Sequence, residues 1–263
     1  MTVEQGMEAQ CVTLYRGDRR VLDDVSVRIE PGSVTAVAGP NGSGKSSLLA
    51  VLAGDLAPAS GQVRLHGREL RQWSDRAQAW RRAVMLQDSL LSFDLPVATV
   101  VALGLVLSGK GDAFSESEVA EAVADVLDEV GLAAMAERPY TRLSGGERQR
   151  VHLARALVQC RRAIPPGCLL LDEPTASLDL KYQRELLRLA RAEADRGAAV
   201  MLILHDLNQV TAVADRVLLL AEGCTRYWGA VAGFFDADLL SRAYDTPLDI
   251  LHRTSEPPLV VWG

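Results

Sequence analysis

A glycine-rich segment constrains this chain more than any other feature of its sequence. It reads Gly39-Pro-Asn-Gly-Ser-Gly-Lys45-Ser46 and fits the pattern G-x-x-x-x-G-K-[ST] at every position. The apolar stretch 34–38 precedes it, and a helical pattern over 46–52 follows it. A strand, a glycine-rich turn and a helix in this order form a loop that holds phosphate groups. The segment therefore predicts an α/β fold with a nucleotide site at the end of a strand.

The residues of this phosphate loop have separate tasks in nucleotide binding. Glycines let backbone N–H groups converge on anionic oxygens, and the following helix adds its positive N-terminal end. Lys45 is placed to neutralise the β- and γ-phosphates, and the Ser46 hydroxyl to ligate Mg²⁺. The nucleotide-binding residues expected here are Gly39, Pro40, Asn41, Gly42, Ser43, Gly44, Lys45, Ser46 and Ser47.

A second motif places two carboxylates at the end of an apolar run, Leu169-Leu-Leu-Asp172-Glu173. Because both faces of this run are apolar, it predicts a central, fully buried strand. Asp172 can then hold the magnesium shell through water, and Glu173 can polarise the attacking water as general base or as its orienter. An isolated Asp-Glu pair would indicate a solvated turn. The strand and the phosphate loop upstream favour catalysis instead.

The segment Leu143-Ser-Gly-Gly-Glu147 lies between these two motifs. Ser144, Gly145, Gly146 and Glu147 fit a capping box that begins a helix over 148–158. Outward-facing N–H groups and a serine at a helix start also make an anion site. The segment is therefore either an ordinary helix start or a second phosphate site, and one chain needs only one such site for one nucleotide.

Size, charge and cysteine usage limit the class of protein. With 263 residues the chain can bury a full core, so one α/β domain with a smaller insert is expected. The net charge of −6 provides no basic field for a phosphate backbone, and no nucleic-acid partner is expected. Four scattered cysteines without a C-x-x-C pair fit reduced thiols in a cytoplasmic protein.

A membrane-spanning segment is not expected. The N-terminus is polar and carries no signal-peptide pattern. The longest apolar stretch, 95–107, falls short of the ~20 residues that a bilayer-spanning helix needs. Work at a membrane would therefore require a partner protein.

Periodicity divides the chain into strand-rich and helical parts. Strands are expected at 12–15, 25–29, 34–38, 83–86, 169–171, 200–204 and 217–220. From Asp88 the pattern becomes helical, and a capping box at Ser115 and Glu118 begins a helix that Gly131 ends. The predicted division is an ATP-binding α/β core over 1–87 and 160–229, a helical subdomain over 88–159 and a C-terminal appendage over 230–263.

These motifs, in this order, resemble the ATP-binding subunits of ABC transporters from about Val12 to about Gly229. The Ser-Gly-Gly-Glu segment is the most specific part of the resemblance. It implies a P-loop NTPase (RecA-like) core with an N-terminal antiparallel β subdomain and an inserted helical subdomain. It also implies a head-to-tail homodimer that holds two ATP between its chains. In that dimer, residues 144–147 close over the ATP on the partner subunit's phosphate loop.

The resemblance assigns further roles. Tyr15 stands where the family places an aromatic ring that stacks on adenine, although a tyrosine at a strand end could equally be a core residue. Gln87 corresponds to a glutamine that touches Mg²⁺ and reports to the membrane subunit, and His205 to a histidine at the γ-phosphate. Asp179 matches a loop that couples the two ATP sites. The expected catalytic residues are thus Glu173, His205 and Gln87, and the expected Mg²⁺ ligands are Ser46, Gln87 and Asp172.

Other segments indicate the kind of ABC ATPase. The insert of about 55 residues over 88–142 lacks the long heptads of chromosome-maintenance relatives. A single cassette also argues against translation-associated relatives. Residues 74–87 resemble the ATPases of iron-siderophore, vitamin B12 and haem importers. The 159–167 connection and the tail 258–263 are most similar to the haem group, although Leu86 departs from a proline frequent there.

The resemblance therefore predicts an ATPase of a haem importer that uses ATP and Mg²⁺. An iron-siderophore or vitamin B12 importer is the nearest alternative, followed by a non-transport ABC ATPase. The implied partners are a second copy of this chain, a membrane permease dimer and, indirectly, a haem-binding protein. The implied location is peripheral, at the cytoplasmic face of the inner membrane.

Overall fold

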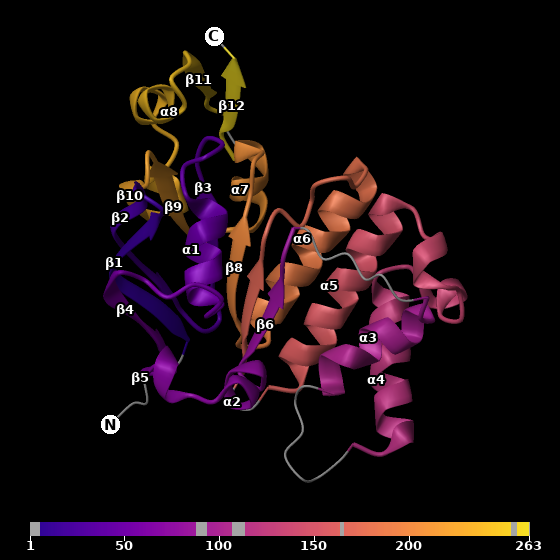
Figure 1. Ribbon diagram of the computed structural model, residues 1–263. Helices are drawn as coiled ribbons and strands as arrows, with labels where there is room; N and C mark the ends of the chain where they lie inside the picture. Colours follow the sequence, from indigo (N-terminus) through magenta and orange to yellow (C-terminus); the bar gives the residue numbers. More distant parts are fainter. Residues whose placement is uncertain (1–5, 88–93, 107–113, 164–165, 254–256, 263) are drawn as a thin grey trace.

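A sheet of mainly parallel strands forms the centre of the structure (Figure 1). The computed structural model describes residues 6–87, 94–106, 114–163, 166–253 and 257–262. The strands of this sheet are, in spatial order, β10 (Cys224–Ala230), β9 (Arg216–Ala221), β3 (Val34–Ala38), β8 (Ala199–Ile203), β7 (Cys168–Leu171) and β6 (Arg82–Met85). Only the β10–β9 pair is antiparallel among them. β3, β7 and β8 are buried throughout, as their unbroken apolar runs predict.

A second, antiparallel sheet comes from the N-terminal part of the chain. Its strands follow the order β2 (Arg19–Ile29), β1 (Met7–Arg16), β4 (Ser60–Leu65) and β5 (Arg68–Glu69). β1 and β2 extend well beyond the strands expected at 12–15 and 25–29. Cross-strand pairing supplies the extra residues, since Met7 pairs with Ile29 on one side and with Leu65 on the other. The expected antiparallel β subdomain is therefore present.

Helix α1 (Lys45–Leu52) lies between the two sheets (Figure 1). Its Leu48, Leu49 and Leu52 are fully buried in a core shared with β1, β2 and one face of the central sheet. Ala53 and Gly54 end the helix, and Gly54 takes a positive φ of 78°, as expected for a glycine at this position. The opposite face of the sheet is covered by α6 (Leu180–Asp195) and α7 (Leu207–Val213).

Further helices gather at the side away from the antiparallel sheet (Figure 1). They are α3 (Val97–Val106), α4 (Glu116–Glu129) and α5 (Gly145–Arg161). Complete capping boxes begin α4 at Ser115 and α5 at Ser144, as predicted. α5 starts before and ends after the expected range 148–158. The start of the helical pattern at Asp88 lies outside the described residues.

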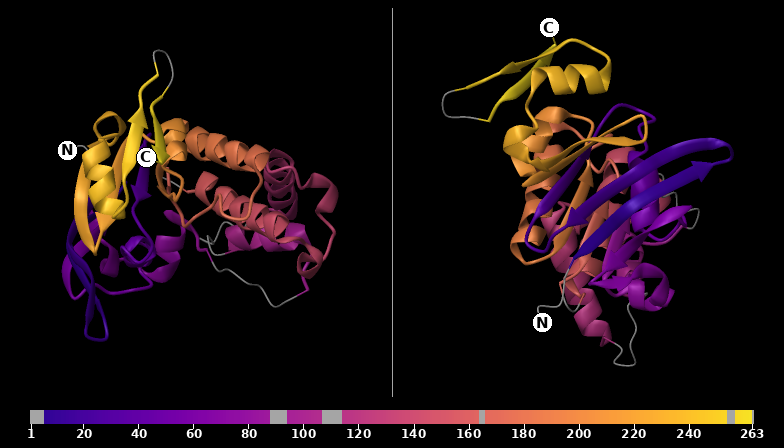
Figure 2. Two further views of the ribbon diagram at one scale, coloured as in Figure 1. Left: turned by 90° about the horizontal axis from the view of Figure 1, so that it is seen from above. Right: turned by 90° about the vertical axis from the view of Figure 1, so that its left-hand side faces the viewer.

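Shorter elements complete the chain. α2 (Asp75–Ala79) precedes β6, and α8 (Ala237–Tyr244) precedes the antiparallel hairpin of β11 (Leu248–Leu251) and β12 (Leu259–Trp262). Figure 2 shows α8 and this hairpin together at one end of the molecule. The 3₁₀ turns are Leu70–Gln72, Ala133–Met135, Tyr140–Arg142 and Val231–Gly233. Every helix within the described residues is too short or too polar to span a bilayer. Cys11, Cys160, Cys168 and Cys224 are free thiols.

Candidate active site

The candidate site lies where neighbouring parallel strands end. Gly39 follows β3, and Gln87 comes two residues after β6. Asp172 and Glu173 follow β7, and His205 comes two residues after β8. These strands are adjacent in the order β3-β8-β7-β6, and the carboxyl ends of parallel strands share one edge of a sheet. The topology therefore brings the sequence-predicted residues of several distant segments together.

The phosphate loop adopts a backbone that only glycine tolerates at two positions. Gly39 has φ 145°, and a Cβ there would lie 2.0 Å from the carbonyl oxygen of Leu220. Gly44 has φ 103°, and its Cβ would lie 2.8 Å from the carbonyl oxygen of Val21. The buried Ser43 hydroxyl has no hydrogen-bond partner among the described residues. This orphaned group and the start of α1 at Lys45 suit an anionic ligand.

Lys45 is held inside the loop. Its ammonium donates hydrogen bonds to the carbonyl oxygens of Gly39, over 2.7 Å, and of Pro40, over 2.9 Å. Burial lowers the pKa of Lys45, while the carboxylates of Glu173 and Asp172 act in the opposite direction. The ammonium group of Lys45 therefore lies at the same edge of the sheet as both carboxylates.

Ser46 and Asp172 form a pair of oxygen ligands. The Ser46 hydroxyl donates to Oδ1 of Asp172 over 3.3 Å. Ser46 is exposed, whereas Asp172 is buried. Desolvation raises the pKa of Asp172, and the hydrogen bond from Ser46 partly offsets that rise. Hydroxyl and carboxylate oxygens are ligands that Mg²⁺ prefers, so this pair fits such an ion.

Glu173 is fixed through both carboxylate oxygens. Gln87 donates from Nε2 to Oε2 over 2.6 Å, and Nε2 of His205 pairs with Oε1. The backbone of Glu173 has a positive φ of 48°, which is unfavourable for a residue with a side chain. Such strain persists only where the surroundings hold it, and it concentrates at functional sites. The side chain of Gln149 contributes by donating to the carbonyl oxygens of Glu173 and Pro174.

The Ser144–Glu147 segment is an exposed helix start beside the chain that follows Glu173. The Ser144 hydroxyl accepts from the Glu147 N–H over 3.3 Å, and the Glu147 carboxylate accepts from the Ser144 N–H over 2.7 Å. Gly145 faces open space. A Cβ on Gly146 would lie 3.2 Å from the carbonyl oxygen of Ser177. The capping box is therefore confirmed, and the segment also presents a free surface.

Tyr15 lies near the end of β1, and Asp179 is the N-cap of α6. Tyr15 is 50% exposed, so the alternative of a core residue is wrong. It pairs with Arg20 in β2, next to Val21, whose carbonyl oxygen packs against Gly44. Asp179 caps α6 by accepting from the N–H of Tyr182 over 3.1 Å. The contact that the structure shows for Asp179 is therefore this helix cap.

Sequence reasoning missed a chain of polar side chains behind the site. The Thr175 hydroxyl donates to Gln209 over 2.9 Å, and Gln209 donates to Gln183 over 3.0 Å. Gln183 in turn donates to the carbonyl oxygens of Thr175 and Leu178. A signal was available, because Gln183 lies in the apolar stripe of α6 that continues at 186, 187 and 190. Gln149 interrupts the stripe of α5 in the same manner.

Comparison with known proteins gives the family. Residues 22–176 match the family model described as ABC transporter. The hemin import ATP-binding protein HmuV of Streptomyces coelicolor is 45% identical over 248 residues, which cover 94% of this chain and 86% of that relative. The protein of the same name from Bordetella pertussis is 42% identical over 255 residues, which cover 95% of this chain and 96% of that relative.

Solved structures agree with this match. An ABC transporter in an inward-facing conformation has a TM-score of 0.79 at 25% identity, covering 98% of this chain and 96% of that chain. A dimeric ATP-binding cassette in a post-hydrolysis state, bound to ADP and Pi, has a TM-score of 0.76 at 26% identity, covering 86% and 98%. The expected P-loop NTPase fold class is therefore confirmed. The chain belongs to the ABC transporter family and is one of its ATP-binding ATPases.

Proposed function

We propose that this ATPase drives haem import through a membrane permease. The proposal rests on the sequence identity of this chain to two proteins named for hemin import. The identity is 45% to one and 42% to the other, over nearly the whole chain. Import of an iron-siderophore or of vitamin B12 is the nearest alternative. A non-transport ABC ATPase is a further one.

The phosphate loop would hold the triphosphate of ATP. Lys45 would exchange its hydrogen bonds to Gly39 and Pro40 for phosphate oxygens, and the N–H groups from Gly42 to Ser47 would cradle them. Tyr15, exposed beside the loop, would stack on the adenine. Ser46, Asp172 and the Oε1 atom of Gln87 would hold Mg²⁺, which neutralises phosphate charge when bound.

Glu173 would act on the attacking water. Its carboxylate would accept a proton from the water or orient it, since the hydrogen bond from Gln87 and the contact with His205 already fix both of its oxygens. His205 is 43% exposed at its side chain and could turn towards the γ-phosphate. Asp172 remains with Ser46, so the two neighbouring carboxylates have separate partners and separate roles.

The active form would be a homodimer with two ATP between its chains. The exposed Ser144 and Gly145, with the half-buried Gly146, would bind the phosphates that the partner subunit's phosphate loop holds. Asp179 and the adjacent Leu180, which is 78% exposed, would lie at the same interface. A solved cassette with a TM-score of 0.76 to this chain is dimeric, which supports this arrangement.

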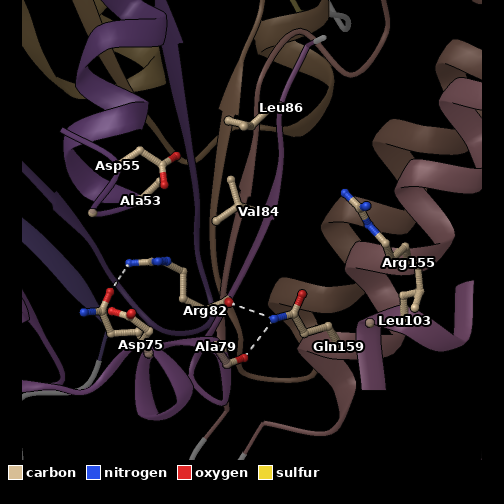
Figure 3. Close-up of a pocket in the computed structure, with 13 residues that line it drawn as sticks. Ala53, Asp55, Asp75, Ala79, Arg82, Val84, Leu86, Leu103, Arg155 and Gln159 are labelled. Carbon is tan, nitrogen blue, oxygen red and sulfur yellow. Dashed lines mark hydrogen bonds between the residues drawn. The ribbon is translucent and has the colours of Figure 1, made fainter. Parts of the chain in front are cut away.

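A groove between the core and the helical insert would receive the permease (Figure 3). It has a volume of about 580 Å³. Figure 3 shows Val84 and Leu86 of the sheet side on one wall and Leu103 and Arg155 of the helical side on the other. Gln159 joins the walls by donating to the carbonyl oxygens of Ala79 and Arg82. Leu86 immediately precedes Gln87, so this groove adjoins the active site.

The domain division that the sequence predicts is part of this proposal. We infer an ATP-binding core over 1–87 and 160–229, a helical subdomain over 88–159 and an appendage over 230–263. Attachment to a permease would place the chain at the cytoplasmic face of the inner membrane. A haem-binding protein would deliver the cargo from the other side and contact the permease rather than this chain.

Growth on defined iron sources tests the proposed cargo. A strain that lacks this chain is supplied with haem, a ferric siderophore or an iron salt, and receives either the wild-type or the Glu173→Gln chain. We expect loss of growth on haem alone, rescued only by the wild-type chain. Loss of growth on the ferric siderophore instead would favour the alternative, an importer of iron-siderophore or vitamin B12. Normal growth on every source would overturn a role in iron acquisition.

A further inference from the structure

The segment 173–178, between β7 and α6, begins with Glu173 and has a strained backbone near both of its ends. Glu173 has a positive φ of 48°, and Ser177 one of 64°. Residues with a side chain disfavour this conformation, so neighbouring groups must hold it. The N–H of Asp172 still donates to the carbonyl oxygen of Met85 over 2.9 Å, as a continuation of the pairing between β7 and β6. The chain then leaves the sheet, and contacts outside the sheet hold Glu173.

The beginning of α5 contacts both strained positions. This helix packs against β6 and β7 (Figure 1). Gln149, in its second turn, donates from Nε2 to the carbonyl oxygen of Glu173 over 3.3 Å and to that of Pro174 over 3.2 Å. An amide nitrogen carries two N–H donors, so one side chain serves both carbonyl groups. Near the other end of the segment, a Cβ on Gly146 would lie only 3.2 Å from the carbonyl oxygen of Ser177.

The carbonyl oxygen of Glu173 accepts two hydrogen bonds. The N–H of Ala176 donates to it over 3.1 Å, which closes a turn with Pro174 in its second position, where the fixed φ of proline is suitable. Gln149 is the other donor. A change of the Glu173 backbone towards negative φ would move this carbonyl group relative to both donors. The two hydrogen bonds therefore favour the strained conformation, and that conformation sets the direction in which the Glu173 side chain leaves the backbone.

The far end of the segment has anchors of its own. Gln183 donates to the carbonyl oxygens of Thr175 over 3.3 Å and of Leu178 over 3.0 Å. The Thr175 hydroxyl donates to Gln209 over 2.9 Å. These glutamines belong to α6 and α7, whereas Gln149 belongs to α5. Loss of the Gln149 amide should therefore release the end that carries Glu173 and leave the rest of the segment in place.

We propose that Gln149 is a positioning residue for ATP hydrolysis, whose amide holds the main chain of Glu173 in the conformation that directs the carboxylate at the attacking water. Gln87 and His205 hold the carboxylate itself, so Gln149 acts on the same residue from its backbone side. The proposal rests on the role given above to Glu173. Because Gln149 contacts neither the phosphate loop nor the carboxylate, its loss should affect hydrolysis rather than binding.

Gln149→Met tests this in the purified full-length chain. Methionine has a similar length but no N–H donor, so it fills the same space without the two hydrogen bonds. We expect kcat to fall about ten-fold, as loss of two hydrogen bonds implies, while the Kd for a fluorescent ATP analogue stays within a factor of two. The matched control is Gln78→Met in α2, which should keep kcat within a factor of two. The Gln78 amide also donates to two carbonyl oxygens, those of Leu70 and Trp73, each over 3.2 Å.

A double-mutant comparison separates positioning from a general loss of structure. Gln149→Met is also made in the Glu173→Gln chain, and the residual hydrolysis is measured in a single turnover. We expect the substitution to lower this residual rate less than two-fold, because the carboxylate that Gln149 positions is already absent. Gln149→Glu serves as the second variant in both backgrounds. Its carboxylate keeps the shape of the side chain but cannot donate, so kcat should fall at least as far as in Gln149→Met.

Three results would overturn the proposal. One is a kcat within a factor of two of the wild type in both Gln149 variants. Another is an equal fold-loss in the wild-type and Glu173→Gln backgrounds, which would leave Gln149 a structural role alone. The third is a loss in Gln78→Met as large as that in Gln149→Met. Failure of the proposed function looks different, because a Glu173→Gln chain that hydrolysed ATP at the wild-type rate would remove the role of Glu173 whatever the Gln149 variants did.

Discussion

The Gln87 amide donates a hydrogen bond to the Glu173 carboxylate over 2.6 Å, although the two residues lie 86 positions apart. The bond connects the end of β6 with the end of β7. Leu86, the neighbour of Gln87, lines the groove between the sheet and the helical insert. We propose that a partner that presses into this groove shifts the Glu173 carboxylate through Gln87 alone. This short path explains how a permease could regulate hydrolysis.

Gln87→Ala removes one of the two groups that fix the Glu173 carboxylate. We expect kcat for ATP hydrolysis to fall about ten-fold, because the carboxylate loses a donor at Oε2 and is less well oriented. The Kd for ATP should change less than kcat, since Gln87 lies outside the phosphate loop and Ser46 and Asp172 would still hold Mg²⁺. Steady-state hydrolysis and equilibrium binding, measured on the same preparation, check this. A variant with wild-type kcat would exclude an orienting role for Gln87.

Lys45→Ala removes the only ammonium that the described structure places in the phosphate loop. We expect the affinity for ATP to fall by at least about a hundred-fold, because a buried charge that would pair with phosphate is lost. Binding of a fluorescent ATP analogue measures the effect. Lys181→Ala is the matched control, since Lys181 is exposed on α6 and should leave the affinity of the single chain unchanged. An unchanged Kd in Lys45→Ala would contradict the assigned nucleotide site.

Arg161 connects three helices through buried and half-buried carboxylates. It contacts Glu129 of α4 and Glu193 of α6, each over 2.7 Å, and Glu193 is only 2% exposed. Because Arg161→Ala leaves Glu193 with a weaker set of partners, we expect a loss of about 3 kcal/mol in the free energy of unfolding in urea. Arg188→Ala, which breaks an exposed pair with Glu185, should cost less than about 1 kcal/mol. Equal losses in both variants would show that burial of the Arg161 network is unimportant.

The Arg161 contact also predicts a pH dependence. Its hydrogen bonds lower the pKa of Glu129 below the usual value of 4.5. A carboxylate with a lowered pKa in the folded state stabilises above its unfolded pKa, and this contribution disappears as the pH falls through the folded pKa. The difference in unfolding free energy between wild type and Glu129→Gln should thus be largest near neutral pH and should vanish in acid. A pH-independent difference would contradict the ion pair.

Gly104 allows α3 and α5 to pack closely. A Cβ at this position would lie 2.4 Å from the backbone carbonyl oxygen of Arg155. We expect Gly104→Ala to lower the free energy of unfolding by about 1–3 kcal/mol, because the helices must separate. Gly145→Ala is the control for stability, since its Cβ would meet open space. A Gly104→Ala protein as stable as the wild type would show that the contact relaxes without cost.

Local sequence predicted the parts of the site that local chemistry determines. The phosphate loop, the acidic strand end and the capping boxes at Ser115 and Ser144 each depend on a few adjacent residues, and each was found. The ends of β1 could not be predicted, because pairing with β2 and β4 extends it to Met7. The contact of Asn208 with Val260 joins segments 52 residues apart, and only the three-dimensional packing reveals it.

The meeting of Gln87, Glu173 and His205 could be predicted from the sequence only in part. The resemblance to ABC ATPases implied their roles, and the parallel order of β6, β7 and β8 explains why they meet. The hydrogen bonds among their side chains did not follow from any spacing in the sequence. The positive φ of Glu173 was likewise invisible, since the sequence places an ordinary glutamate at that position.

The most direct test of this account measures the mass of the Glu173→Gln protein in millimolar Mg-ATP by analytical ultracentrifugation. The amide cannot activate water but leaves the phosphate loop intact, so we expect a stable dimer that holds two ATP. Lys45→Ala should remain monomeric under the same conditions, and the wild type should return to monomer as ATP is consumed. A Glu173→Gln chain that stayed monomeric at saturating ATP would contradict the ATP sandwich and the catalytic role of Glu173 within it.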